Sequence, residues 1–380
     1  MSKSFANLQM VDLNGQYQKI KPEVDAAIQE VIDQTAFIKG KPVSDFEQEL
    51  ADYLGVKHVI ACANGTDALQ LALMALDLKP GDEVITPDFT FIATVEVVAL
   101  LGLKPVLVDV NLDDYTISIE ALKNAITPKT KAIIPVHLFG QCANMEAIMS
   151  IAEEKGIAVV EDVAQAIGST YFFSNGSSVK AGTIGTIGCT SFFPSKNLGC
   201  YGDGGALFTN DSKLADEIRS IANHGMRVRY HHDRIGVNSR LDTIQAAILR
   251  IKLKRLDEYN LARQEAAMRY DALFRDCNKL IIPQRVIWSN HTFHQYTLRL
   301  VDGDRAKLVE ALKSKEIPAM VYYPIPLHKQ KAFQPYVDAC ITRLYPNSIA
   351  LSNSVFSLPM HTELNQEVQE FIAENVLSLL

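Results

Sequence analysis

The chain has 380 residues, of which 48% are hydrophobic and 21% are charged, and its formal net charge is −7. This length and composition predict a compact soluble protein of two domains and argue against a general binding surface for nucleic-acid phosphates. No run approaches ~18 uninterrupted apolar residues, and the N-terminus lacks the apolar core of a signal peptide, so we expect a cytoplasmic protein without a membrane span.

Short apolar strands alternate with helices through the first two-thirds of the chain. Strands are predicted at residues 58–62, 83–86, 105–110, 132–136 and 157–160, and helices at residues 68–76, 93–101 and 145–155. Strands that are apolar throughout are typical of a mostly parallel sheet with helices on both faces, so we expect an α/β fold. Ligands bind beyond the carboxyl ends of such strands. Those ends carry residues 64–67, residues 87–89, His137 and Asp162.

The pattern changes near residue 240. Residues 241–260 predict one long helix. The rest of the chain contains the segment 295–301, a helix at 307–315, an extended segment at 322–328 and a helix at 366–379. We therefore expect a large domain over residues 1–250, with an N-terminal helical segment, and a smaller C-terminal α+β domain over residues 251–380.

The six cysteines are scattered along the chain. None forms a Cys-x-x-Cys pair, which favours reduced thiols over disulfides or a zinc site. The adjacent His231 and His232 have no cysteine or glutamate nearby at ligand spacing, so a metal site is not expected. The cysteines are Cys62, Cys142, Cys189, Cys200, Cys277 and Cys340.

A lysine and an aspartate carry the main chemical prediction. Lys196 lies just before a glycine-rich segment at residues 199–205, and Asp162 ends an apolar strand 34 residues upstream. A lysine that forms a Schiff base, with an acid that keeps the pyridine nitrogen protonated, is how proteins hold and tune pyridoxal 5′-phosphate. An aspartate at a strand end more often caps a helix, so the prediction depends on the pair.

Further residues near these strand ends are candidate cofactor contacts. Residues 64–68 follow a strand and open a helix, where backbone N–H groups and the helix dipole favour an anion such as a phosphate. An ordinary capped turn would have the same sequence. Thr66 and Ser191 add hydroxyl donors. Gln165 could reach the cofactor's phenolic oxygen or complete a capping box, and Phe89 could stack on the ring or belong to the core.

Residues 227–234 contain three arginines and two histidines, and Asn238 and Arg240 follow closely. In a chain of net negative charge, this positive cluster favours an anionic ligand such as a diphosphate or a carboxylate. A solvated loop is the alternative interpretation.

Taken together, these motifs resemble the DegT/DnrJ/EryC1/StrS sugar aminotransferases, a branch of the fold-type I pyridoxal phosphate enzymes, over essentially the whole chain. The resemblance rests on residues 64–69, 87–91, 161–165, 191–196 and 236–242. It implies that Lys196 bonds the cofactor, that Asp162 pairs with the pyridine nitrogen, that Gln165 meets the phenolic oxygen and that Phe89 stacks on the ring.

The resemblance also implies that the phosphate is held by Gly65, Thr66 and Ser191. Asn238 would reach the cofactor phosphate of the partner subunit, in an obligatory homodimer with shared active sites. Sugar dehydratases of the family have a histidine at the lysine position, so Lys196 favours the aminotransferases.

Residues 140–143, 194–201, 229–232 and 323–327 resemble those of enzymes that aminate the 3-keto group of UDP-2-acetamido-2-deoxy-3-oxo-glucuronate for bacterial surface polysaccharide, such as the O-antigen of lipopolysaccharide. The resemblance implies L-glutamate as the amino donor. The residues expected to bind substrate are Arg229, Arg240, Tyr323 and His328. The polar segment at residues 172–178 is longer than the resemblance leads us to expect.

Three alternatives stay open at this point. The keto substrate could instead be a 4-keto-hexose nucleotide or a cyclitol ketone. The chain could be a regulatory protein that binds pyridoxal phosphate without turnover, which half-transamination with glutamate would exclude. A Rossmann-type NAD enzyme is disfavoured, because no Gly-x-Gly-x-x-Gly follows the first strand.

Overall fold

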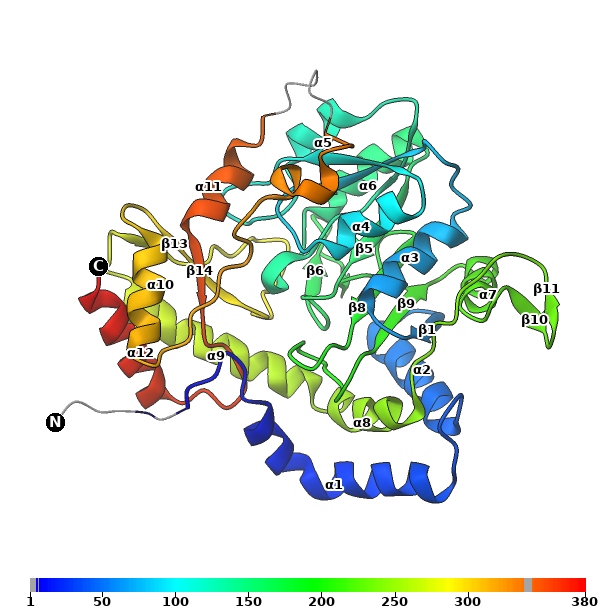
Figure 1. Cartoon of the computed structure of the whole chain (residues 1–380), viewed down its shortest axis with the longest axis horizontal. Coiled ribbons are helices and arrows are strands. Elements are labelled where there is room, and N and C mark those ends of the chain that lie inside the picture. The colour runs from blue at the N-terminus through cyan, green and yellow to red at the C-terminus, as the bar shows by residue number, and fades with distance from the viewer. Residues whose placement is uncertain (1–4, 6, 338–343) are drawn as a thin grey trace.

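A seven-stranded sheet, formed by strands between residues 58 and 209, is the largest sheet of the described residues (Figure 1). The computed structural model describes residue 5, residues 7–337 and residues 344–380. Within this sheet only β9 is antiparallel to its neighbours, which confirms the predicted mostly parallel α/β architecture. In spatial order the strands are β1 (His58–Cys62), β9 (Gly205–Thr209), β8 (Ile187–Ser191), β5 (Ala158–Asp162), β4 (Thr130–Ile133), β2 (Glu83–Pro87) and β3 (Lys104–Val108).

Helices cover both faces of this sheet, because apolar side chains of each strand alternate between two cores. Val59 and Ala61 of β1 join one core, whereas Ile60 and Cys62 join the other. The first core is completed by α2 (Lys41–Leu54), α5 (Ile119–Ala125), α6 (Met145–Lys155) and α8 (Thr243–Leu253). The second is completed by α3 (Gly65–Ala75), α4 (Ala93–Leu100) and α7 (Ser212–Ile221).

A third core lies in the C-terminal part of the chain. A three-stranded antiparallel sheet of β12 (Leu280–Ile281), β13 (Tyr296–Leu300) and β14 (Val355–Leu358) packs there with α9 (Leu256–Phe274), α10 (Arg305–Ser314) and α12 (Gln366–Ser378). Leu8 also packs against this core. The remaining elements of this part are η2 (Leu327–Lys329), η3 (Lys331–Phe333) and α11 (Pro346–Ser354). The domain boundary at residue 250 falls inside α8 and stays a prediction.

The single long helix predicted at residues 241–260 was wrong. The chain instead forms α8 and α9, which are separated at Lys254 and Arg255, and Arg255 leaves the helical conformation with φ −112° and ψ 3°. α8 buries apolar residues in the first core, whereas α9 buries Ala266, Tyr270 and others in the third. Because of this break, α8 can pack in the first core while α9 packs in the third.

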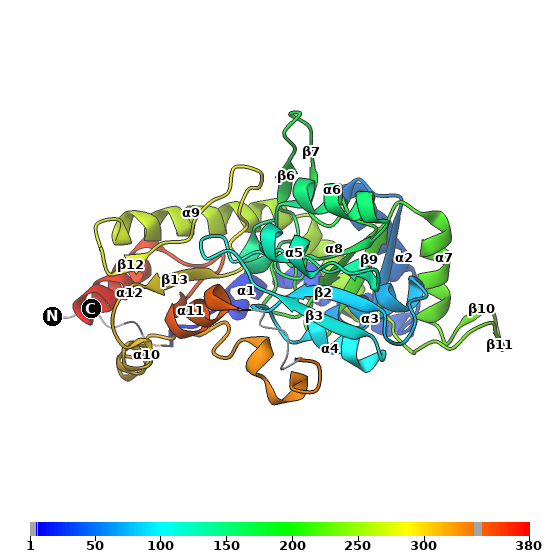
Figure 2. The same cartoon turned by 90° about the horizontal axis from the view of Figure 1, so that it is seen from above.

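Two hairpins extend from the body of the molecule (Figure 2). β10 (Met226–Val228) and β11 (His231–His232) form the first, which carries much of the arginine and histidine cluster. The polar segment at residues 172–178 connects β6 (Thr170–Phe172) to β7 (Ser178–Lys180) in the second. The N-terminal helical segment is α1 (Leu13–Asp33).

The five described cysteines are free thiols, and Cys340 lies outside the described residues. Among the helices of the described ranges, none combines the length and the apolar character needed to cross a bilayer.

Candidate active site

A cavity of about 820 Å³ lies at the carboxyl ends of the parallel strands. Its lining contains seven of the predicted site residues, which come from the ends of β5 and β8, from the segments after β1, β5 and β8, and from the C-terminal part of the chain. These seven are Gly65, Thr66, Asp162, Gln165, Ser191, Lys196 and Tyr323. The fold therefore brings together residues that lie up to 258 positions apart in the sequence.

Lys196 stands in the turn that follows β8, where its backbone N–H donates to the Phe193 carbonyl at 2.8 Å. Within the described ranges, no residue forms a hydrogen bond or ion pair with its amine. Loss of hydration in this enclosed site lowers the pKa of Lys196 to about 8, although the negative charge of Asp162 acts in the opposite direction. A lysine with this pKa has a substantial neutral fraction near pH 7–8 and is a competent nucleophile.

Asp162 ends β5 with its carboxylate at the cavity. Oδ2 accepts a hydrogen bond from Thr94 Oγ1 at 2.8 Å, and Oδ1 accepts one from the Ala164 N–H at 3.1 Å. A turn rather than a helix follows at residues 164–168, so Asp162 does not cap a helix. The arrangement leaves a carboxylate, fixed by two donors, facing the same cavity as the Lys196 amine.

Glu161 has a different environment, because successive side chains of a strand point to opposite faces. Its buried carboxylate accepts hydrogen bonds from the backbone N–H groups of Gly182, Ile184 and Gly185 at 3.0, 2.7 and 2.6 Å. His137 Nε2 lies 2.9 Å from the same carboxylate, and His137 Nδ1 accepts from the Ala143 N–H, so Nε2 carries the proton. We expected His137 near the site, but it is hydrogen-bonded to the buried Glu161 of β5 and does not line the cavity.

The turn before α3 forms a close-fitting cradle. Asn64 caps the helix by accepting the Asp67 N–H at 2.8 Å. A Cβ added at Gly65 would lie 2.6 Å from Ser191 Cβ, so any larger residue would force the helix away from Ser191. The N–H groups at the start of α3 and the Ser191 and Thr66 hydroxyls thus meet at one end of the cavity, where an anion would be stabilised.

Gln165 connects two segments around the cavity. Its Oε1 accepts from the Phe139 N–H at 2.7 Å, and its Nε2 donates to the Tyr323 hydroxyl at 3.1 Å. No capping box forms, since no helix begins at this position. The predicted contact between Gln165 and the phenolic oxygen of the cofactor remains a proposal. The Nε2 group that would make this contact donates to the Tyr323 hydroxyl in this structure.

Phe89 lies elsewhere than expected. It is buried in a cluster with Val136, Phe139 and Leu351, and it is not among the cavity's lining residues. Phe91, two positions later in the same motif, lines the cavity and is half exposed. The two residues are two positions apart, so the alternation of side chains along an extended segment would place both on the same face. The sequence pattern therefore could not distinguish them.

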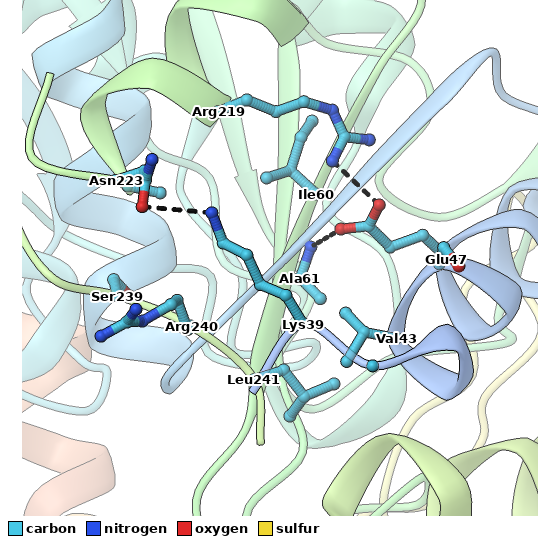
Figure 3. A pocket seen from close by; sticks show the side chains of 13 residues that line it. Lys39, Val43, Glu47, Ile60, Ala61, Arg219, Asn223, Ser239, Arg240 and Leu241 are labelled. Atoms are coloured by element: carbon cyan, nitrogen blue, oxygen red, sulfur yellow. Dashed lines mark hydrogen bonds and ion pairs between the residues drawn. The ribbon is translucent and has the colours of Figure 1, made fainter. Parts of the chain in front are cut away.

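The remaining predicted site residues, for the partner's cofactor phosphate and for the substrate, do not line the large cavity of their own chain. Asn238 is exposed, and Arg229 lies on the projecting hairpin, where it donates to the Tyr230 hydroxyl at 3.1 Å. Arg240 lines a second, smaller pocket (Figure 3). His328 is held by Asp88, which accepts from its backbone N–H at 2.7 Å and lies 2.6 Å from its Nδ1.

Several lining residues were missed by the sequence analysis. His294 and Gln295 lie just before β13, and their side chains are buried in the cavity wall. Burial, with the nearby positive charges of Lys196 and Arg263, holds the pKa of His294 well below its usual range, so its ring is neutral. These two residues neither follow a predicted strand nor lie near a glycine-rich turn, so no sequence pattern indicated that they are site residues. The other missed residues include Asp203 and Tyr322.

Known proteins share this sequence and fold over nearly their whole lengths. The model of the DegT/DnrJ/EryC1/StrS aminotransferase family matches residues 18–377. A UDP-2-acetamido-2-deoxy-3-oxo-D-glucuronate aminotransferase of Pseudomonas aeruginosa is 47% identical over 94% of this chain and 96% of its own. A UDP-N-acetyl-3-dehydro-alpha-D-glucosamine 3-aminotransferase of Acidithiobacillus ferrooxidans is 45% identical over 94% of both chains.

The fold matches solved structures as well. The crystal structure of NtdA from Bacillus subtilis, with the cofactor PMP bound, superposes with a TM-score of 0.90 at 29% identity, over 99% of this chain and 86% of that one. These matches confirm the resemblance that the motifs predicted. The chain belongs to the DegT/DnrJ/EryC1/StrS aminotransferase family.

Proposed function

We propose that this chain is a pyridoxal phosphate-dependent aminotransferase that moves the amino group of L-glutamate to C3 of UDP-2-acetamido-2-deoxy-3-oxo-glucuronate. The carrying observation is that the Lys196 amine and the Asp162 carboxylate face one cavity, with the cradle of Gly65 and Ser191 at its end. These residues fit the cofactor, because they provide an amine for its aldehyde, an acid for its ring nitrogen and a close-fitting anion site for its phosphate.

When bound, pyridoxal phosphate supplies an electron sink for the pair of electrons left when a proton leaves the amino-bearing carbon. Lys196 would anchor the cofactor, then accept that proton and deliver it to the carbon of the cofactor's aldehyde group. Asp162, fixed by Thr94, would keep the ring nitrogen protonated. The N-terminus of α3 with Thr66 and Ser191 would hold the phosphate, and Phe91, which lines the cavity, would cover the ring.

A homodimer with shared active sites is part of the proposal. The charged residues that line the large cavity are three carboxylates and the Lys196 amine, so a diphosphate needs cations from elsewhere. Asn238, Arg229 and Arg240 lie outside their own cavity on the projecting hairpin and the segment after it. Exposed apolar side chains accompany them, including Tyr230 at 75% and Ile235 at 88%, as expected of a surface that a second subunit covers.

Complementation between inactive chains tests the shared site. We expect Lys196→Ala and Asn238→Ala homodimers each to be severely impaired, and a mixture to regain activity. The heterodimer has one site with an intact Lys196 and an intact Asn238 from its neighbour. Activity of the mixed chains after subunit exchange is the measurement. If exchange is demonstrated by mass spectrometry and no activity returns, Asn238 does not act across the interface.

A second substrate is favoured by a specific observation, since the Acidithiobacillus relative is named for a 3-keto sugar of the glucosamine series. The experiment offers the purified protein L-glutamate and each of three ketones, and mass spectrometry identifies the ketone that gains an amine. The ketones are the 3-keto-glucuronate nucleotide, its neutral 3-keto-glucosamine counterpart and a 4-keto-hexose nucleotide. We expect the first to react fastest. The product would enter surface-polysaccharide synthesis, and we place the reaction in the cytoplasm.

Arg229 provides a sharper test of the carboxylate. A charge-assisted contact contributes about 1.5–3 kcal/mol, so Arg229→Ala should lower kcat/KM for the glucuronate ketone by about tenfold to a hundredfold. The loss should be smaller with the neutral ketone. Arg227→Ala is the matched control, because Arg227 lies on the same hairpin but is paired with Glu217 at 2.5 Å. Equal losses with both ketones would contradict a carboxylate contact.

A further inference from the structure

A second pocket of about 270 Å³ contains a cluster of cations (Figure 3). Ser239, which lines this pocket, donates to Asp67 in the first turn of α3 at 2.6 Å. Its charged lining residues are Lys39, Arg219, Arg240 and Glu47. Arg219 is paired with Glu47 at 2.9 Å, so this pair is neutral overall. Lys39 and Arg240 are left as two cations without a carboxylate partner among the described residues.

The Lys39 side chain crosses the pocket towards the segment that carries Asn238 (Figure 3). Its Nζ donates to Asn223 Oδ1 at 3.1 Å, and the backbones of Asn223 and Asn238 pair in an antiparallel bridge. Arg240 stands two residues after Asn238. Lys39 therefore lies next to the segment that carries Asn238 and Arg240, although about 200 residues separate them in the sequence.

The loop that carries Lys39 is held in an unfavourable conformation. Lys39 has φ +54° and Thr35 has φ +49°, in the left-handed region that favours glycine. Backbone contacts fix the loop: Thr243 N–H donates to the Phe37 carbonyl at 3.0 Å, and Ile38 forms a bridge with Asp242. Non-glycine residues keep such conformations where the surroundings determine them, often at ligand sites. The exposed apolar side chains of Phe37 and Ile38 adjoin Lys39, as at a covered interface.

We propose that Lys39 and Arg240 form a two-cation clamp for the diphosphate of the nucleotide-linked sugar bound in the partner subunit's active site. The proposal rests on the proposed function and on the shared site. The large cavity supplies acidic residues and one amine, whereas this pocket supplies two unpaired cations on the surface assigned to the interface. A diphosphate is the ligand group that matches two cations of one pocket, since its charge is divided between two phosphate centres.

Kinetics of the two half-reactions of the holoenzyme can distinguish a contact with the sugar nucleotide from a general effect on the protein, because only one half-reaction uses the nucleotide. Lys39→Asn removes the charge with a residue that tolerates positive φ, Lys39→Gly relieves the backbone, and Lys39→Arg keeps the charge. We expect the Asn and Gly variants to raise KM for the keto-sugar nucleotide and the inhibition constant of UDP by about tenfold to a hundredfold. The Arg variant should retain most of the affinity, and the glutamate half-reaction should be unchanged in all three.

Lys41→Gln is the matched control, because Lys41 is a neighbouring lysine paired with Asp45 at 2.7 Å. It should leave both half-reactions unchanged. A mixture of Lys39→Asn and Lys196→Ala chains tests the direction of the contact. The heterodimer's site with an intact Lys196 receives an intact Lys39 from its neighbour, so it should show the normal KM for the sugar.

Four results would overturn the clamp. They are an unchanged sugar KM in the Asn and Gly variants, an equal loss in both half-reactions, a rise confined to glutamate KM, and a heterodimer that keeps the raised sugar KM. Inhibition by inorganic phosphate that weakens as much as inhibition by UDP would assign the pocket to a single phosphate and would also contradict the diphosphate. Failure of the proposed function would instead appear in the wild-type protein, as no amination of any UDP-linked ketone.

Discussion

Lys196→Ala is expected to abolish transamination, with a loss of at least about 10⁴-fold, because it removes the nucleophile and the proton carrier together. Among the residues that the structure describes, no other lysine lines the cavity. Borohydride reduction of the wild-type holoenzyme should fix the mass of the cofactor on the peptide that contains Lys196. The variant should take up no covalent label.

Lys252 provides the internal comparison. Burial also lowers its pKa to about 8, but its amine donates to the Gly199 carbonyl at 2.6 Å and lies outside the cavity. A cofactor label on Lys252 would show that a low amine pKa, and not a position in the cavity, decides which lysine bonds the cofactor. That result would refute the assignment of Lys196.

The lowered pKa of Lys196 also sets the pH dependence of cofactor capture. The neutral amine is the nucleophile, so its population rises as pH increases through about 8 and reaches a plateau above that value. The rate at which cofactor-free protein develops the absorbance of the covalent complex should follow this curve. A midpoint near the usual value for lysine would contradict an enclosed amine.

Asp162→Asn is the second change with a large expected effect. Asparagine preserves the shape and can still accept from Thr94 or the Ala164 N–H, but it cannot keep the pyridine nitrogen protonated. Breaking a buried charge pair by removing one partner costs about 3–5 kcal/mol, which corresponds to about 10²–10⁴-fold in rate. The measurements are kcat of each half-reaction and the absorbance of the bound cofactor.

Thr94→Val is the control for Asp162, because it removes only the hydrogen bond at 2.8 Å and leaves the carboxylate. Its loss should be far smaller than that of Asp162→Asn. If Asp162→Asn retains nearly full rate with a folded, cofactor-loaded protein, another group protonates the ring and the assignment is wrong.

The strand ends were the most predictable part of the site. The predicted strand at residues 58–62 and helix at residues 145–155 match β1 and α6, and Lys196, Asp162, Gly65 and Ser191 meet in one cavity. Parallel strands place their carboxyl ends at one edge, so these residues could be grouped without coordinates. β8 and β9 were not predicted, and β9 begins at Gly205, the last residue of the glycine-rich segment.

Features that depend on tertiary packing could not be predicted in the same way. Phe89 and Phe91 are chemically alike, and only their neighbours decide which one is buried. His294 and Gln295 reach the cavity because the C-terminal part of the chain packs against the strand ends, where Gln295 N–H donates to the Phe139 carbonyl at 3.3 Å. The break between α8 and α9 depends on two cores that form from different parts of the chain.

The projecting β10–β11 hairpin has a consequence for how the protein behaves in dilute solution (Figure 2). If residues beyond it complete the neighbour's site, catalysis follows the law of mass action, and the fraction of working sites depends on the concentration of subunits. Specific activity then falls on dilution below the dissociation constant of the dimer. A ligand that contacts both chains at once, as we propose for a sugar nucleotide in the shared site, would oppose this loss, so the substrate itself would help to hold the assembly together.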